Sequence, residues 1–481
     1  MNRKMVFYLF GRILQVEALL LLLPALTSLV YGETRVLLTF LSVAGGSALF
    51  GTLVALLCRT KNKVIYAKEG FAIVALAWVG MSVVGALPFV ISGDIPNYFD
   101  AFFEIVSGFT TTGASVLPNV ERLSHGALFW RSFSHWVGGM GVLVFVMAIV
   151  RNMSDRSIHI MRAEMPGPIV GKLVPRASDT AKILYLIYIV LTVIQIIMLC
   201  AGGMPFFDSL IHSFGTAGTG GFGIKSNSIA GYSNYSQIVI TVFMLIFGVN
   251  FNLYYLLLIR RFRSVLKSTE LWAYLGMVAV SIVVITFNIL PIYDNFNDSL
   301  RHASFQVSSI ITTTGYTTTD FNVWPHLSKG ILLLLMCLGG CAGSTAGGLK
   351  VSRAVILFKL ILREIKKMLH PRAVTSVKFE GKAVEDGTLS SVATYFAVYA
   401  FCIFAAFLVI CFEPFGFESN VTAVLTTFNN VGPGFATVGP MGGFGEYTAF
   451  SKIVFSFAML FGRLEIFPMI IALSPSTWMK K

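Results

Sequence analysis

A short glycine-containing phrase occurs four times in this chain, each time between apolar segments long enough to cross a bilayer. Glycine adopts positive φ at little cost, so it suits a backbone whose carbonyls must turn toward an ion. Rings of such carbonyls replace the hydration shell of a permeating cation. Four copies in one chain therefore predict a complete ring around one pore. The predicted ion-binding residues are Thr111, Thr112, Gly113, Thr219, Gly220, Thr314, Gly315, Val431 and Gly432.

Each phrase follows a polar helix start and a short amphipathic run. The four runs cover residues 100–109, 208–214, 303–311 and 419–428. They are too short to cross a bilayer, so we predict re-entrant half-helices. A half-helix that enters from outside turns its partially negative C-terminus inward, where four such ends would stabilise a cation. Glycine and threonine also serve transmembrane packing, which would explain one copy better than four copies at matching positions.

The composition places this pattern in a membrane. The chain has 481 residues, of which 56% are hydrophobic and 12% charged, with a mean hydropathy of +0.77. A soluble domain carries about 25% charged residues, so we predict a polytopic α-helical membrane protein. The predicted spans are residues 5–30, 36–58, 71–91, 127–150, 181–201, 236–259, 271–291, 328–349, 391–411 and 450–473.

Lysine and arginine gather on one side of this predicted topology. Ten spans place both termini on the same side, together with Arg59, Lys61 and the segments 151–182 and 350–382. The opposite loops are poor in Lys and Arg, so both termini are predicted to be cytoplasmic. Those loops carry acidic residues such as Asp94, which would concentrate cations at an entrance or simply solvate the loops. The net charge of +13 is thus explained by topology, and no nucleic-acid partner is expected.

The repeat divides the chain into five segments. Residues 1–70 form a two-span hairpin without a glycine phrase. The predicted pore repeats cover residues 71–180, 181–270, 271–390 and 391–481. The predicted fold is therefore all-α, with four M1–pore loop–M2 repeats around a pseudo-fourfold pore, preceded by the two-helix hairpin.

No pattern typical of catalysis or of a resident metal occurs in the chain. The six cysteines lack metal-ligand and disulfide spacings, and Cys337 and Cys341 favour a packing role. His135 and His212 lie in apolar surroundings, which favours structural roles. Phosphate-binding and dinucleotide-binding motifs are absent. We expect no enzymatic activity and no organic cofactor.

A second glycine-rich stretch follows the apolar segment 331–338. Residues 339–348 contain five glycines. At about 1 kcal/mol each, these glycines disfavour a continuous helix, and irregular backbone at bilayer depth needs a neighbouring cavity. We predict a helix break after Leu338 and a second helix from Lys350 to Met368. Helix packing is the alternative use of these glycines.

Arg463 places a charge in the middle of the predicted span 450–473. A charge at this depth normally faces the bundle interior or water. Glu465 lies two residues away on a different helical face, so proximity in sequence does not make it the partner. A structural ion pair is the alternative to a role in the pore.

The four phrases, the break after Leu338 and the Gly462–Glu465 phrase together resemble the Trk/Ktr/HKT superfamily of potassium transporters. The resemblance covers essentially the full chain and is strongest for the bacterial branch with two spans before the repeats. It implies potassium as the permeant ion, a location in the bacterial cytoplasmic (inner) membrane among membrane lipid, and a homodimer with one pore per protomer. It also implies a cytosolic, TrkA-like regulatory subunit that binds nucleotide.

The resemblance further implies that residues 339–348 form an intramembrane loop that blocks the pore. The implied gating residues are Gly339, Gly340, Gly343, Ser344, Thr345, Gly347, Gly348, Lys350 and Arg463. The phrases depart from the Thr-Val-Gly-Tyr-Gly phrase of tetrameric potassium channels, since only Gly315 is followed by tyrosine. A simpler filter that also accepts rubidium is therefore expected. In the plant branch, serine at the first glycine accompanies sodium selectivity, so Gly113 favours potassium.

Two transport mechanisms fit the sequence. A gated, channel-like pore is favoured, because the four units share one orientation and carboxylates within the spans are few, namely Glu17 and Glu465. Flux would then be driven by the membrane potential. The alternative is a secondary transporter with one central site, including proton or sodium symport, although such folds usually carry paired inverted repeats.

Overall fold

The computed structural model of the protein describes residues 1–60, 66–141, 177–293, 295–373 and 375–479. Within these residues, six helices are long and apolar enough to cross a membrane. They are Arg3–Val30, Thr34–Leu57, Lys68–Ser92, Asp179–Ala201, Thr269–Tyr293 and Asp386–Ile410. The only strands in the described part are β1 (Lys378–Phe379) and β2 (Lys382–Ala383), which pair antiparallel with Lys378 opposite Ala383. The prediction of an all-helical, multi-pass membrane protein is confirmed.

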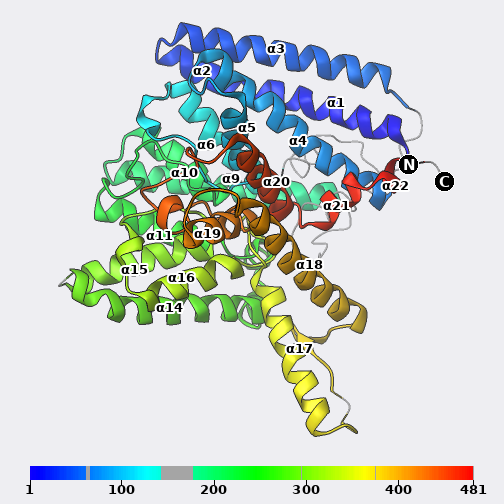
Figure 1. Ribbon diagram of the computed structural model, residues 1–481, viewed down its shortest axis with the longest axis vertical. Helices are drawn as coiled ribbons and strands as arrows, with labels where there is room; N and C mark the ends of the chain where they lie inside the picture. Colours follow the sequence, from blue (N-terminus) through cyan, green and yellow to red (C-terminus); the bar gives the residue numbers. More distant parts are fainter. Residues whose placement is uncertain (61–65, 142–176, 294, 374, 480–481) are drawn as a thin grey trace.

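The N-terminal hairpin forms one edge of the molecule (Figure 1). It consists of α1 (Arg3–Leu20), α2 (Leu22–Val30) and α3 (Thr34–Leu57). Gly11 of α1 and Gly51 of α3 face each other so closely that a side chain on either would press on the other's backbone. Small residues at such a crossing allow two apolar helices to approach, and the hairpin then packs against the first repeat.

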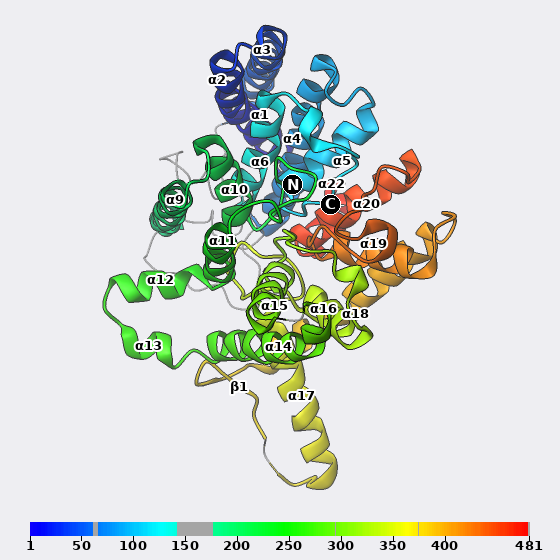
Figure 2. The same cartoon turned by 90° about the vertical axis from the view of Figure 1, so that its left-hand side faces the viewer.

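A pattern of three helices follows four times: a long apolar helix, a short helix and a second helix. Its members are α4 (Ala67–Ser92), α5 (Tyr98–Phe109) and α6 (His125–Gly139); α9 (Ala177–Ala201), α10 (Phe206–Gly218) and α11 (Asn234–Phe247); α14 (Thr269–Tyr293), α15 (Phe296–Ile311) and α16 (His326–Leu338); and α18 (Asp386–Ile410), α19 (Phe417–Phe428) and α20 (Ala449–Arg463). In Figure 2 the short helices α5, α10, α15 and α19 surround a common centre.

The short helices begin where the sequence provides caps. The side chain of Asn97 accepts a hydrogen bond from Phe99 N, and that of Asn295 accepts one from Asn297 N. Each short helix also has an acidic residue in its first turn, which the partial positive charge there favours. Each ends at its glycine phrase, but α15 begins at Phe296, before the predicted run 303–311, and α10 continues to Gly218, beyond the predicted run 208–214.

The second helices are shorter than predicted, which corrects three of the ten spans. We expected continuous helices over 127–150, 236–259 and 450–473, but α6 ends at Gly139, α11 ends at Phe247 and α20 ends at Arg463. Residues 142–150 lie outside the described residues. The chain turns by 90° between α11 and α12 (Phe251–Leu258), and α21 (Phe467–Leu473) follows α20 after a short break. Apolar residues continue on both sides of the breaks after α11 and α20, so mean hydropathy over a whole span does not reveal them.

The remaining helices of the described residues connect the repeats, lie within them as short 3-10 turns, or come near the end of the chain. They are α13 (Phe262–Leu266), α17 (Val351–Leu369), α22 (Pro475–Trp478) and the 3-10 turns Val120–Arg122, Phe321–Val323 and Ala436–Val438. Helix α22 lies beside the N-terminus (Figure 1), where the guanidinium of Arg3 donates to Trp478 O and Lys68 Nζ of α4 donates to Ser476 O at 2.9 Å. Helix α17 projects away from the body in both views. The division of the chain into five segments at residues 70, 180, 270 and 390 stays a prediction.

Candidate ion-binding site

The four glycine phrases share one backbone conformation. In each, a non-glycine residue has φ of 55° or 56°, and a glycine two positions later has φ between 74° and 100°. The first position is occupied by Thr111, Thr219, Thr313 and Asn430, and the glycine position by Gly113, Gly221, Gly315 and Gly432. The amide of the residue between them bonds back into the short helix, as Thr112 N does to Ser107 O at 2.9 Å and Val431 N to Thr426 O at 2.9 Å. We call these segments filter loops 1 to 4.

This shared geometry corrects the predicted register of loop 2. The sequence aligned Gly220 with Gly113, whereas the structure places Gly221 at the positive-φ position. Gly220 instead corresponds to Thr112, since Gly220 N bonds to Gly215 O at 2.8 Å in the same pattern. The phrase Gly218-Thr219-Gly220-Gly221 offers more than one candidate glycine, and only the φ angles distinguish them.

The four loops meet in a closed ring. A methyl group added to Gly113 would overlap the carbonyl oxygen of Gly220, and one on Gly221 would overlap that of Thr314. One on Gly315 would overlap Val431 O. One on Gly432 would come within 2.7 Å of Thr112 O. Each glycine thus faces the carbonyl that precedes the equivalent glycine in the next loop, and the fourth loop returns to the first. Only glycine fits all four positions, because both φ and space exclude a side chain.

The threonine hydroxyls of the filter loops mainly form hydrogen bonds within their own loop. Thr110 Oγ1 and Thr112 Oγ1 lie 2.8 Å apart, as do Thr312 Oγ1 and Thr314 Oγ1. Loop 4 has asparagine where the others have threonine, and this longer side chain reaches loop 1. Asn430 Nδ2 donates to Thr112 Oγ1 at 2.9 Å and to Met459 O at 3.0 Å. Loops 1 and 4 are therefore joined by a side-chain bond as well as by contact.

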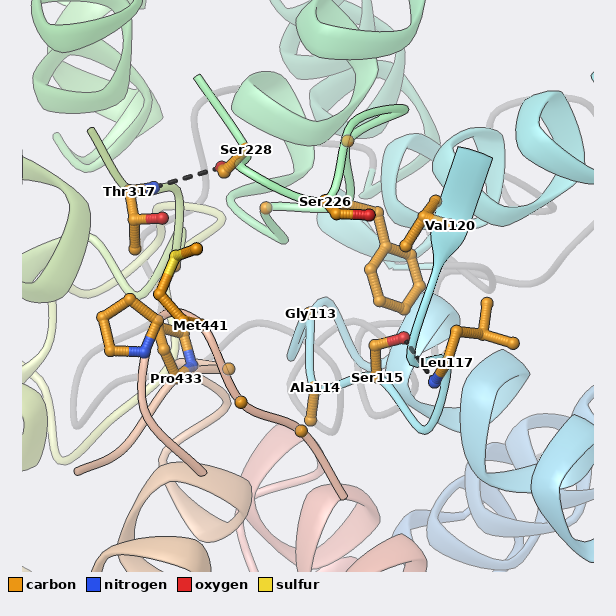
Figure 3. Close-up of a pocket in the computed structure, with 18 of the residues that line it drawn as sticks. Gly113, Ala114, Ser115, Leu117, Val120, Ser226, Ser228, Thr317, Pro433 and Met441 are labelled. Atoms are coloured by element: carbon orange, nitrogen blue, oxygen red, sulfur yellow. Dashed lines mark hydrogen bonds between the residues drawn. The ribbon is translucent and has the colours of Figure 1, made fainter. Parts of the chain in front are cut away.

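A vestibule of about 190 Å³ opens on one side of the ring. All four filter glycines contribute to its lining, which makes it continuous with the ring. Figure 3 shows residues that follow the glycines, including Ala114, Thr317 and Pro433, at its wall. Thr317 N donates to Ser228 Oγ at 3.2 Å, so the segments that follow filter loops 2 and 3 are joined at this wall.

The two histidines that we assigned to structural roles support the loops. His135 Nδ1 lies 2.8 Å from Gly108 O, and Phe222 N donates to His135 Nε2 at 3.3 Å. His212 Nδ1 lies 3.3 Å from the hydroxyl of Tyr316, which donates to Phe222 O at 3.1 Å. Both rings are fully buried behind the ring of loops. Their contacts are to backbone and tyrosine, as expected for structural side chains.

The glycine-rich stretch 339–348 lies on the other side of the ring. As predicted, α16 ends at Leu338, and α17 begins at Val351, one residue after the expected Lys350. Gly347 N donates to Thr313 Oγ1 at 2.6 Å, so this intramembrane loop touches filter loop 3 directly. A methyl group on Gly347 would overlap Asn429 O beside loop 4. The loop therefore lies beneath the ring, at the end remote from the vestibule.

Backbone bonds hold the intramembrane loop in place. Cys341 N donates to Gly248 O at 3.0 Å, and Phe251 N donates to Gly343 O at 3.0 Å, so the break between α11 and α12 supplies its partners. The loop closes on itself where Lys350 N donates to Leu338 O at 2.8 Å. The other predicted gating residues, Gly339, Gly340, Ser344, Thr345 and Gly348, lie in the same loop, and Gly339, Gly343 and Gly348 have positive φ.

Arg463 lies at the end of a helix and not in the middle of one, which corrects the sequence interpretation. It is the last residue of α20, where a cation is favourable. Its guanidinium donates to Thr345 O at 2.7 Å, to Gly138 O at 2.7 Å and to Gly139 O at 2.6 Å. Arg463 therefore ties the intramembrane loop to the end of α6. Glu465 pairs instead with Arg353 of α17.

Three buried charged residues near these loops escaped the sequence interpretation. Glu270 Oε1 accepts from Ala342 N at 2.7 Å and from Ser352 N at 3.1 Å, so it ties the intramembrane loop to the first turn of α17. Glu104 and Arg131 form an ion pair beside filter loops 1 and 2. Glu104 and Glu270 contact residues that lie far from them in the sequence. Neither acidic residue, taken alone, therefore signals its role.

Known proteins resemble this chain over its whole length. A model of the TrkH family, described as cation transport protein, matches residues 45–480. The Trk system potassium uptake protein TrkH of Salmonella typhimurium is 38% identical over 95% of both chains. That of Vibrio parahaemolyticus is 35% identical over 99% of this chain and 100% of the relative. The crystal structure of the potassium transporter TrkH from Vibrio parahaemolyticus superposes with a TM-score of 0.88, covers 100% of both chains and is 33% identical. This chain belongs to the TrkH family of cation transport proteins.

Proposed function

We propose that this protein takes up potassium through a single gated pore whose selectivity filter is the ring of the four loops. The observation that carries the proposal is the closed cycle of glycine–carbonyl contacts from loop 1 to loop 4 and back. Relatives named potassium uptake proteins, similar over nearly the whole chain, support potassium as the cargo.

The proposed ligands are oxygen atoms of the filter loops. Backbone carbonyls replace the hydration shell of an alkali cation, and the C-terminal ends of α5, α10, α15 and α19 contribute partial negative charge at the same place. The proposed potassium-binding residues are Thr111, Thr112, Gly113, Thr219, Gly220, Gly221, Thr313, Thr314, Gly315, Asn430, Val431 and Gly432. Relative to the sequence prediction, Gly221, Thr313 and Asn430 are added by the shared loop geometry.

We propose that the intramembrane loop is the gate. Its contact with Thr313 and its place beneath the ring would block an ion that leaves the filter. Arg463 would keep the loop in place through Thr345 O and add a positive barrier to cations. The residues assigned to gating are Gly339, Gly340, Gly343, Ser344, Thr345, Gly347, Gly348, Lys350 and Arg463.

A test of the gate follows from the bond between Gly347 N and Thr313 Oγ1. Thr313→Val keeps the shape of the side chain but removes the acceptor, so a buried amide loses its partner at a cost of about 1–3 kcal/mol. We expect the blocked state to weaken and the basal rubidium flux into proteoliposomes to rise about fivefold or more. Thr313→Ser, which keeps the hydroxyl, should leave the flux near wild type. Equal fluxes for the valine and serine variants would contradict this bond as part of the gate.

The proposed setting is the cytoplasmic membrane of a bacterium, with both termini in the cytoplasm. Basic residues on α17 and near both chain ends support this orientation. A homodimer and a TrkA-like, nucleotide-binding cytosolic subunit are proposed as partners, by analogy with the Trk system named for the relatives. A pull-down of the purified protein with a TrkA-like subunit, with ATP and ADP compared, tests the second partner.

Growth on limiting potassium tests the proposed function. In a bacterial strain without potassium uptake systems, expression of this chain should restore growth at low potassium, because the pore would admit potassium along the membrane potential. Planar-bilayer recording of the purified protein then separates a channel from a carrier, since a channel gives stepwise currents. Failure to restore growth by protein that is present in the membrane and folded would contradict potassium uptake.

A further inference from the structure

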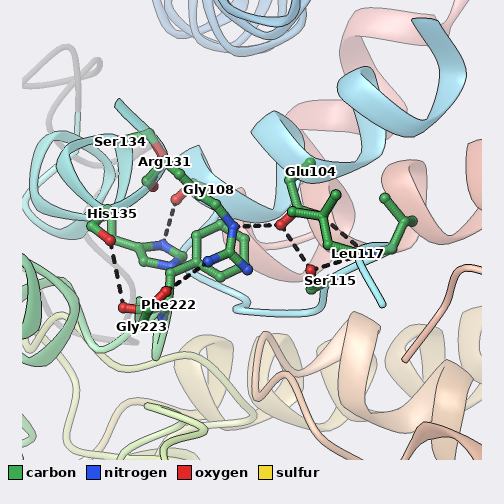
Figure 4. Close-up of polar contacts among 11 residues, drawn as sticks. Glu104, Gly108, Ser115, Leu117, Arg131, Ser134, His135, Phe222 and Gly223 are labelled. Carbon is green, nitrogen blue, oxygen red and sulfur yellow. Dashed lines mark hydrogen bonds and ion pairs between the residues drawn. The ribbon is translucent and has the colours of Figure 1, made fainter. Parts of the chain in front are cut away.

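A buried ion pair lies beside the ring on its vestibule side (Figure 4). Glu104 of α5 is fully buried, and Arg131 of α6 is 3% exposed. Arg131 Nε donates to Glu104 Oε1 at 2.5 Å. The same carboxylate accepts from Ser115 Oγ at 2.9 Å and from Val116 N at 3.0 Å. Ser115 and Val116 follow the first filter phrase, so Glu104 fixes the segment of chain that directly follows filter loop 1.

Arg131 carries the connection on to loop 2. Its Nη1 donates to Gly223 O at 3.1 Å, and its guanidinium carbon lies 3.5 Å from the centre of the Phe222 ring. Phe222 and Gly223 directly follow Gly221, the glycine of loop 2. In Figure 4 the side chains of Glu104 and Arg131 form one line of contacts from the segment that follows loop 1 to the segment that follows loop 2. The pair therefore spans the junction between these two loops.

At the other junctions the hydrogen bonds between the loops are neutral among the described residues, and the ion pairs Lys452–Asp100 and Lys329–Glu418 join the first turns of α5 and α19 to the neighbouring second helices. Tyr316 of loop 3 donates to Phe222 O of loop 2 at 3.1 Å. Between loops 3 and 4, Ala436 N donates to Asn322 Oδ1 at 2.9 Å. Between loops 4 and 1, Asn430 donates to Thr112. The ion pair between loops 1 and 2 tolerates substitution less well than the neutral contacts between the other loops, because loss of one partner leaves the other charge buried and uncompensated.

Arg131 also lines the vestibule, so its charge faces the cation path. A guanidinium at the mouth of a cation pore repels the permeant ion unless an anion neutralises it. Among the described residues, Glu104 is the carboxylate that contacts Arg131. The pair thus joins loops 1 and 2 and also neutralises a positive charge beside the cation path.

We propose that Glu104 and Arg131 are positioning residues for ion selectivity. They fix the spacing between loops 1 and 2, and hence between the carbonyls of Thr112 and Gly220, which determines the preference for potassium over sodium. Neither side chain is assigned contact with the ion. The inference rests on the proposed function of the ring as a selectivity filter.

The test measures the potassium-to-sodium permeability ratio of the full chain in proteoliposomes, from the reversal potential under opposed potassium and sodium gradients. Glu104→Gln and Arg131→Gln should each lower the ratio about tenfold, which corresponds to about 1.4 kcal/mol. Arg131→Lys keeps the charge but not the planar fork that reaches both Glu104 and Gly223, so its ratio should fall between these values and wild type. Arg301→Gln breaks a partly exposed arginine–aspartate pair on α15 and serves as the matched control, with an unchanged ratio.

A wild-type ratio in folded Glu104→Gln or Arg131→Lys protein would overturn the proposal. A loss confined to the yield of folded protein, with an unchanged ratio, would also overturn it and leave a purely structural pair. If the glutamine variants do not fold, Arg131→Lys decides. Gly113→Ser tests the proposed filter independently of the ion pair. If Gly113→Ser changes the permeability ratio while the Glu104 and Arg131 variants keep the wild-type ratio, the positioning role of the pair is contradicted and the filter is not. Wild-type ratios in all of them contradict the filter.

Discussion

Replacement of Arg463 by alanine should raise the basal cation flux about tenfold or more. The guanidinium donates to Thr345 O of the intramembrane loop and to Gly138 O and Gly139 O at the end of α6. A hydrogen bond with a charged donor contributes about 1.5–3 kcal/mol, and about 1.4 kcal/mol shifts an equilibrium tenfold. Loss of these bonds therefore weakens the blocked arrangement, and loss of the charge lowers the barrier to cations. Rubidium uptake into proteoliposomes, normalised to folded protein, measures the effect.

Two further substitutions separate the bonds of Arg463 from its charge. Arg463→Lys keeps the charge but cannot reach three carbonyls with one planar fork, so its flux should rise less than that of the alanine variant. Arg463→Gln removes the charge and keeps a donor. Arg261→Ala, at an exposed arginine between α12 and α13, is the matched control and should leave the flux unchanged. An unchanged or reduced flux for folded Arg463→Ala would assign Arg463 a structural role only.

Gly113→Ser should lower the potassium-to-sodium permeability ratio about tenfold. The backbone of Gly113 has φ of 78°, and a Cβ there would overlap the carbonyl oxygen of Gly220 in the next loop. The side chain can be accepted only if that carbonyl moves, and a displaced carbonyl no longer replaces the hydration shell of potassium in the same geometry. Reversal potentials in mixed potassium and sodium solutions measure the ratio.

The matched control for this substitution is Gly276→Ser on α14. An added Cβ at Gly276 meets no atom within 4 Å, and the residue lies within a helix away from the ring. Its ratio should equal that of wild type. Equal ratios for wild type, Gly113→Ser and Gly276→Ser would contradict the role of Gly113 in the filter.

The short helices and the glycine phrases could be predicted from the sequence, because both depend on local pattern. The runs 100–109 and 419–428 correspond to α5 and α19 to within two residues at each end. The break after Leu338 was also predictable, since five glycines in ten residues disfavour a helix wherever they occur. These features need no knowledge of distant partners.

Other features depend on partners far apart in sequence. At the break after Phe247, the carbonyl of Gly248 accepts a hydrogen bond from Cys341 N in the intramembrane loop, and no local stretch of sequence shows this partner. The register of loop 2 depends on which glycine faces the carbonyl of Thr314. Glu104 and Arg131 read as an isolated acid and an isolated base until the fold brings them together. Tertiary contact, rather than composition, determines each of these.

We propose that the four loops form one cation site within a single chain. Crystals of the full-length protein grown in rubidium would locate the ion by its anomalous scattering. We expect a peak inside the ring, within coordinating distance of the carbonyl oxygens of Thr112, Gly220, Thr314 and Val431. An empty ring, with rubidium bound at a site lined by residues of one loop only, would contradict it.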